Sequence, residues 1–454
     1  MLKKHDKNVN TNSVSKYDLD GKPPLTEAIP LGLQHILAMF VGNVTVPLII
    51  AGILGMNDVD KTILVQSAMI VAGIATLVQL YPIGRVGARM PVVMGTSFGF
   101  LPSNIAIGKA FGLPGILGAQ FIGGLFCAVL GFFLKPLRKF FPSLVTGTVV
   151  LTIGLSLLPT GIEYMAGGKG ATDFGSPKYW LVALIVMITI ILLKEFTKGF
   201  TSTASILIGL IVGYVISIPM GLVDFTAVGD AGWFSLPKFL YFKPTFHWEA
   251  IAAMMIMFVV TTVETVGDIS GVAMGGANRE ATDRELSGGI IANGLGSSFA
   301  ALFNALPNTS FSQNVGLISF TGVMSRFVVA TGAVFLLIAG LFPKLGALIV
   351  TIPQSVLGGA TIVMFSQIAL TGITLITQEK LTSRNKIIVG LSLAFGLGLT
   401  QVPAAIAYMP ESAKLIFGGS GIVVACIVAL VLNVVIPNTE NKDTENKKEI
   451  AIES

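Results

Sequence analysis

Long apolar segments follow one another along most of this chain, and they restrict what it can fold into. A hydrocarbon core about 30 Å thick needs roughly 20 apolar residues in each spanning helix. Only 12% of the residues are charged and 53% are hydrophobic, which excludes a soluble globular protein. The sequence therefore predicts an all-α polytopic membrane protein, with twelve clear spans near residues 30–51, 62–81, 113–134, 141–160, 179–196, 201–220, 248–269, 286–304, 325–343, 347–374, 385–402 and 415–436.

Two further apolar stretches are too short to span a membrane as ordinary helices. One runs from Met94 to Gly108 after Pro91, and the other runs from Phe311 to Met324 after Pro307. Counting both as crossings gives fourteen segments, of which these are the third and the tenth.

The distribution of basic residues supports this count. With the N-terminus inside, 21 of the 29 Lys and Arg residues fall in cytoplasmic segments, as the positive-inside rule requires. Dropping the two short crossings would spoil the pattern. We therefore expect a protein of the cytoplasmic membrane, with both polar tails, 1–29 and 438–454, in the cytoplasm.

The two short stretches resemble each other and indicate an internal repeat. The first contains Thr96-Ser97-Phe98 and the second contains Thr309-Ser310-Phe311. Each is third in its own group of seven, and an odd number of crossings per half makes the halves inverted. Extended backbone at membrane depth needs partners, so we expect the two stretches to pair as short strands beside the substrate site. The alternative is two ordinary kinked helices.

Carboxylates inside a membrane are costly and are therefore functional candidates. Glu264 and Asp268 lie four residues apart, on one face of the predicted helix 248–269. The alternative is a structural hydrogen bond within the helix bundle, which the sequence favours more for Asp268 than for Glu264.

Other polar and aromatic candidates lie near the same segments. Gln313 and Asn314 open the second half-helix, where an amide offers both a donor and an acceptor, or else caps the helix. Gln34 and His35 lie in the first span and could equally hydrogen-bond a neighbouring helix. Phe98 could stack on a planar ring or simply pack in the core.

Several classes of function lack support. The sequence contains no HExxH, Walker A, GxGxxG or CxxC pattern, so we expect neither an enzyme nor a metal or cofactor site. The net charge of +5 is too small to indicate a nucleic-acid partner.

The motifs resemble those of one family, the nucleobase–ascorbate transporters (nucleobase:cation symporter-2), in its xanthine and uric acid permease branch. The string from Gln313 to Gly322 is similar to the family's Q/E-N-x-G-x-x-x-x-T signature. The pair Gln34-His35, the string Gly95-Thr96-Ser97-Phe98 and the ETxGD-like pattern around Glu264 and Asp268 match three further motifs in the same order.

This resemblance implies a fold and a set of roles. It implies a 7+7 inverted repeat, a homodimer in the lipid bilayer, and import of a purine by proton symport with elevator-like alternating access. It gives Glu264, Gln313, Phe98, Ser97 and Asn314 to substrate binding, with Asp268, His35 and Gln34 in support. It also implies a core domain at 30–134 and 248–343 and a gate domain at 135–247 and 344–437.

Some alternatives stay open. Asn293 stands where some purine carriers have an Asp, which weakens any role of that span in proton coupling. The first rival is a uracil permease of the same fold, and the second is an anion exchanger or channel on a similar 7+7 architecture. Sodium is the alternative coupling cation, and the sequence does not rank xanthine against uric acid.

Overall fold

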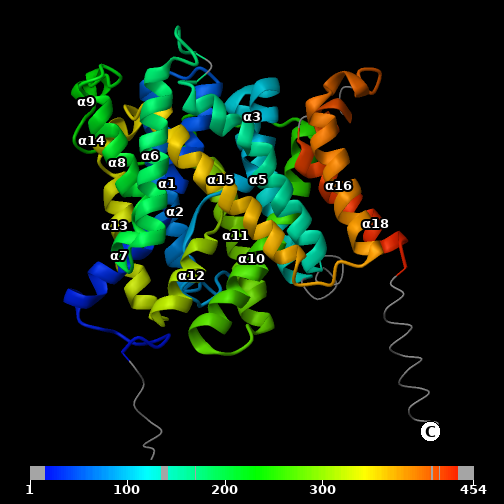
Figure 1. Cartoon of the computed structure of the whole chain (residues 1–454). Helices are drawn as coiled ribbons and strands as arrows, with labels where there is room; N and C mark the ends of the chain where they lie inside the picture. The colour runs from blue at the N-terminus through cyan, green and yellow to red at the C-terminus, as the bar shows by residue number, and fades with distance from the viewer. Residues whose placement is uncertain (1–15, 134–141, 169, 411–412, 419, 438–454) are drawn as a thin grey trace, which may run out of the picture.

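The computed structural model describes residues 16–133, 142–168, 170–410, 413–418 and 420–437, and they form a bundle of packed helices (Figure 1). Residues 1–15 of the N-terminal tail and all of the C-terminal tail 438–454 lie outside the described residues. Seven of the described helices are long and apolar enough to cross a membrane. These seven are α1 (Leu25–Ile53), α2 (Asp58–Leu80), α3 (Leu101–Phe132), α5 (Ser143–Met165), α6 (Pro177–Phe196), α10 (Trp248–Ala277) and α15 (Gln354–Ile376).

Shorter elements connect and complete these helices. The remaining α-helices are α7 (Phe200–Thr203), α8 (Ser205–Ser217), α9 (Thr226–Asp230), α11 (Asp283–Leu302), α12 (Ser312–Thr321), α13 (Arg326–Gly340), α14 (Pro343–Val350), α16 (Ser383–Gln401) and α18 (Gly421–Val435). Three short helical turns are η1 (Phe98–Phe100), η2 (Pro403–Ile406) and η3 (Lys414–Gly418). The described part of the chain is thus predominantly helical, as expected; the count of fourteen crossings stays a prediction.

Two three-residue strands lie buried inside the bundle. Strand β1 (Met94–Thr96) pairs antiparallel with β2 (Asn308–Ser310), and Gly95 lies opposite Thr309. This is the pairing expected from the repeated sequence, and it gives backbone at membrane depth its hydrogen-bond partners. A Cβ on Gly95 would lie 2.4 Å from the Met39 methyl and 2.8 Å from the Phe311 ring, so a larger residue there would have to displace both side chains.

Each strand is followed by helical structure. Strand β1 leads through η1 into α3, which breaks at Gly112, where φ is 68°. That break lies near the boundary that the sequence predicted between the third and fourth crossings. Strand β2 leads into α12, which ends at Gly322 in the left-handed conformation.

One expected span is not continuous. The sequence predicted a single segment over 347–374, but α14 ends at Val350 and α15 begins at Gln354. Pro353 between them has no N–H to donate and disfavours a helical conformation in the residue before it. Helix α14 instead follows α13 across a bend of 84°.

The helices fall into two groups around the strands. In one group α3 packs on α10 and α11, and α13 packs on α1 and α2. In the other group α15 packs on α5 and α6, and α18 packs on α5 and α16. The backbone oxygens of Tyr17 and Leu19 accept hydrogen bonds from the N–H groups of Met324 and Arg326, so the N-terminal segment lies at the end of the molecule where α12 finishes.

Close glycine contacts hold α3 against α11, and they allow a stability prediction. A Cβ at Gly294 would lie 2.4 Å from the Ala128 nitrogen and 2.5 Å from the Gly124 oxygen, which are both backbone atoms. We expect Gly294→Ala to destabilise the purified protein by about 1–3 kcal/mol, a lower melting temperature in detergent being the measurement. Gly390→Ala on α16 is the control, because nothing lies within 4 Å of its added Cβ. Equal melting temperatures for the two variants would contradict this packing.

Candidate functional site

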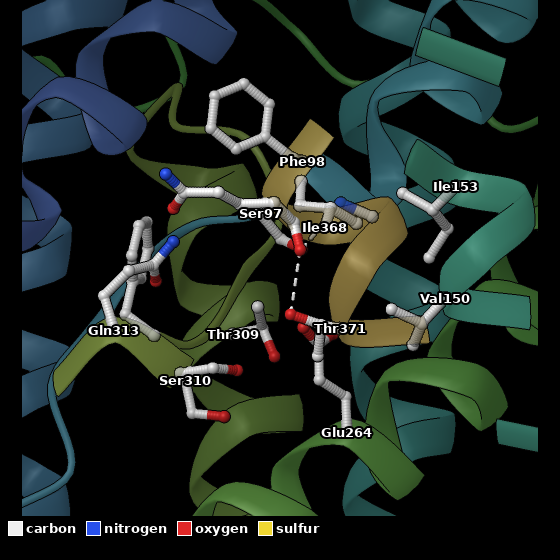
Figure 2. A pocket seen from close by; sticks show the side chains of 14 residues that line it. Ser97, Phe98, Val150, Ile153, Glu264, Thr309, Ser310, Gln313, Ile368 and Thr371 are labelled. Carbon is white, nitrogen blue, oxygen red and sulfur yellow. Dashed lines mark hydrogen bonds between the residues drawn. The ribbon is translucent and has the colours of Figure 1, made fainter. Parts of the chain in front are cut away.

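A cavity of about 220 Å³ lies between the two helix groups, beside the paired strands. Its volume suits a ligand smaller than the drug-sized molecules that fill typical pockets of 300–1,000 Å³. Figure 2 shows its labelled side chains arriving from both groups. The lining residues are Ser97, Phe98, Gly99, Glu264, Thr309, Ser310, Phe311, Ser312 and Gln313 from the first group, and Val150, Ile153, Gln367, Ile368 and Thr371 from the second.

The two carboxylates of α10 have different surroundings. Glu264 lines the cavity, and its carboxylate makes no hydrogen bond or ion pair to the described part of the chain. Asp268, one turn further along, is buried and accepts a hydrogen bond from the Ser310 hydroxyl of β2. Glu264 is therefore available to a ligand or a proton, whereas Asp268 fixes α10 to the strand.

The two amide side chains at the start of α12 also have different surroundings. Gln313 lines the cavity, and Figure 2 shows its side chain on the α12 side of the site. Asn314 is buried away from the cavity, and its amide nitrogen donates to the His35 backbone oxygen at 2.9 Å and lies 3.1 Å from His35 Nδ1. Consecutive helical residues point about 100° apart, which is consistent with Gln313 facing the cavity and Asn314 facing α1.

The first-span candidates do not line the cavity. His35 is buried against Asn314, and the Gln34 side chain donates to the Thr203 hydroxyl of α7 at 3.3 Å. These contacts connect α1 with α12 and with α7. In this structure both residues therefore position neighbouring helices and do not face the cavity.

The segment after β1 brings one aromatic ring to the site. Phe98 lines the cavity, is 8% exposed, and meets the Phe365 ring edge-on with 5.5 Å between the centroids. Ser97 precedes it; its hydroxyl accepts from the Gly99 N–H at 3.1 Å and its own N–H donates to the Pro307 oxygen at 3.0 Å. These contacts hold the ring in the cavity wall, where a planar ligand could meet it.

A chain of polar side-chain contacts joins α11, the ninth expected span, to β2. The Asn293 amide donates to the Thr265 hydroxyl at 3.2 Å, and that hydroxyl lies 3.5 Å from the Thr309 hydroxyl. All three side chains are buried. Asn293 therefore supports the strand beside the cavity without lining it.

The sequence analysis missed the wall opposite Glu264. Gln367 and Thr371 lie one turn apart on α15, and Val150 and Ile153 lie on α5. Gln367 was visible as a polar residue inside an apolar span, but nothing in the sequence placed that span against β1 and β2. Phe311, next to the strand, was visible only as a member of the repeated motif.

Comparison with known proteins gives a consistent result. A family model described as a permease family matches residues 26–405. The uric acid permease PucK of Bacillus subtilis is 40% identical over 405 residues, which cover 89% of this chain and 94% of that protein. A xanthine permease of Bacillus subtilis is 39% identical over 412 residues, which cover 90% of this chain and 93% of that protein.

Solved structures show a shared fold at much lower identity. The transmembrane domain of the cyanobacterial bicarbonate transporter BicA superposes with a TM-score of 0.56 at 16% identity, over 90% of this chain and 97% of that domain. This likeness concerns the fold alone, and the permease relatives are the ones that cover the chain at high identity. The chain therefore belongs to the permease family of nucleobase:cation symporter-2 transporters, and it is a multi-pass membrane transporter rather than an enzyme.

Proposed function

We propose that this protein imports a purine nucleobase, xanthine or uric acid, across the cytoplasmic membrane by proton symport. The observation that carries the proposal is the convergence of three groups on one cavity. The Glu264 carboxylate, which has no hydrogen-bond partner among the described residues, lines this space between the two helix groups together with an amide (Gln313) and an aromatic ring (Phe98). A purine dione has N–H and C=O groups along its edge and a planar ring, and these three side chains complement both features.

The two helix groups support an elevator-like mechanism. We propose that these two groups form a core domain (30–134 and 248–343) and a gate domain (135–247 and 344–437), and the cavity between the groups supports this division. Sliding of one group against the other would expose this cavity to each side in turn. We further propose that both termini are cytoplasmic, which the distribution of basic residues supports, and that two chains form a homodimer.

The rivals differ in the ligand that they would bind. A uracil permease of the same fold would use the same cavity. An anion exchanger on the fold shared with BicA would take small inorganic anions, which have no planar ring for Phe98 to stack on.

One uptake experiment separates these readings. Cells expressing the chain would be given labelled xanthine, uric acid, uracil and guanine, with and without a proton uncoupler. We expect xanthine or uric acid to accumulate and the uncoupler to abolish accumulation. Sodium-dependent uptake that survives the uncoupler would refute proton symport, and preferred uptake of uracil would refute the purine assignment.

Phe98 provides a separate test of the binding mode. If its ring stacks on the base, Phe98→Ala should weaken purine binding by about 1–3 kcal/mol, as removal of other base–aromatic stacks does. Phe98→Tyr should keep most of the affinity, because it retains the ring face. Competition binding to the purified protein would measure both variants, and melting temperatures would report any loss of packing against Phe365. Unchanged affinity in the alanine variant would leave Phe98 a core residue only.

A further inference from the structure

A second cavity, of about 630 Å³, adjoins the first. Gln313 and Gln367 line both cavities, so these two amides stand where the cavities meet. The other walls of the second cavity come from the end of α6, the turn into α7, the start of α8 and the outer part of α12. In Figure 1, α7 and α12 lie at the same end of the molecule as residues 16–24 at the start of the described chain. With the N-terminus inside, the second cavity is a vestibule between the binding cavity and the cytoplasm.

The charge of this vestibule has one sign. Lys194, in the last turn of α6, and Lys198, just before α7, both line it, and no Asp or Glu does. Neither lysine makes an ion pair with any described residue. Glu195, next to Lys194 in the sequence, interacts with it electrostatically, but it is exposed and outside the lining.

Basic residues at this end of the molecule have an ordinary explanation. Lysines are common at the cytoplasmic ends of spanning helices, and a lysine in a last turn also complements the helix dipole. That explanation accounts for the presence of Lys194 and Lys198 near the end of α6. It does not account for their both lining a cavity that adjoins the binding site.

Charge of one sign that lines a cleft with low-dielectric walls has a specific effect. Such walls focus the field and raise the local concentration of a ligand of opposite sign. The purines proposed above differ in charge, because uric acid loses a proton more readily than xanthine does. Near neutral pH uric acid is an anion, whereas xanthine is largely neutral.

We propose that Lys194 and Lys198 form an anion-attracting vestibule that favours the urate anion over neutral purines on the path between the cytoplasm and the binding cavity. This inference rests on the proposed purine transport and adds a charge preference to it. The two lysines act on the approach of the ligand and leave its contacts with Glu264 and Gln313 unchanged. The preference should therefore weaken as salt screens the charges.

The test uses inside-out membrane vesicles, in which the vestibule faces the medium. The variant Lys194→Gln/Lys198→Gln would be compared with wild type for initial exchange rates of labelled urate and labelled xanthine at slightly acidic pH. We expect urate exchange at low salt to fall about three- to tenfold and xanthine exchange to change by less than twofold. Raising the salt concentration should reduce the difference between wild type and the variant for urate.

A charge-matched control removes two lysines elsewhere at the same end. Lys380 and Lys386 are exposed and line neither cavity, so Lys380→Gln/Lys386→Gln should leave both rates near wild type. Equal slowing of urate and xanthine by the first variant, or the same urate loss in the control, would overturn the vestibule. Wild-type exchange of xanthine without urate would also overturn it. Wild-type vesicles that exchange neither purine would overturn the proposed function together with this inference.

Discussion

Replacing Glu264 with glutamine is expected to abolish uphill purine accumulation while leaving the protein folded in the membrane. The Glu264 carboxylate lines the cavity and makes no hydrogen bond to the described residues, so the substitution removes no visible structural contact. Glutamine has nearly the same shape, but an amide does not take up and release a proton as a carboxyl group does. The measurement is accumulation of labelled xanthine and uric acid against a gradient, with membrane expression and melting temperature measured in parallel.

Asp268→Asn is the matched comparison on the same helix face. Its carboxylate accepts from the Ser310 hydroxyl, so this substitution weakens the contact between α10 and β2 and should lower the melting temperature. We thus expect the Glu264 variant to lose coupling with normal stability and the Asp268 variant to lose stability. Normal uphill uptake by Glu264→Gln would remove Glu264 from the energy-coupling mechanism.

The sequence was informative where structure follows from local properties. The length of an apolar segment determines whether it can span a bilayer, and most expected spans coincide with helices of the structure. The paired strands also followed from the sequence, because two copies of a Thr-Ser-Phe motif stand at matching positions of the repeat. The break at Pro353 did not follow from the sequence, because prolines also lie inside continuous helices of this chain, such as Pro47 in α1 and Pro159 in α5.

The other features of the site depend on how each helix is oriented about its own axis and on which helices it packs against. Asn314 follows Gln313 directly, yet it turns to His35, while Gln313 faces the cavity. The composition of α12 does not reveal this difference. The same holds for α15, where Gln367 and Thr371 became site residues only because that helix packs beside the strands. Motifs thus located one wall of the site, and tertiary packing supplied the other.

Replacing Gln313 with glutamate is expected to remove much of the purine uptake and to make the remainder more pH-dependent. A neutral amide donates and accepts at once, so it can pair with an N–H and C=O edge of a purine dione, whereas a carboxylate only accepts unless it is protonated. An unmatched polar group in a buried site costs about 1–3 kcal/mol, which is enough to change transport by roughly tenfold or more. Competition of xanthine, uric acid and uracil for uptake would measure the effect.

A control at a neighbouring position separates hydrogen bonding to the purine edge from the effect of added negative charge. Gln367→Glu introduces the same charge on the α15 wall, at the same junction between the two cavities. If pairing with the purine edge is what matters, Gln313→Glu should reduce purine uptake more than Gln367→Glu does. If both substitutions reduce uptake equally, added negative charge near Glu264 explains the loss. If uracil outcompetes purines in wild type, or if Gln313→Glu transports purines unchanged, Gln313 does not select the substrate, and the preference must arise elsewhere on the cavity wall.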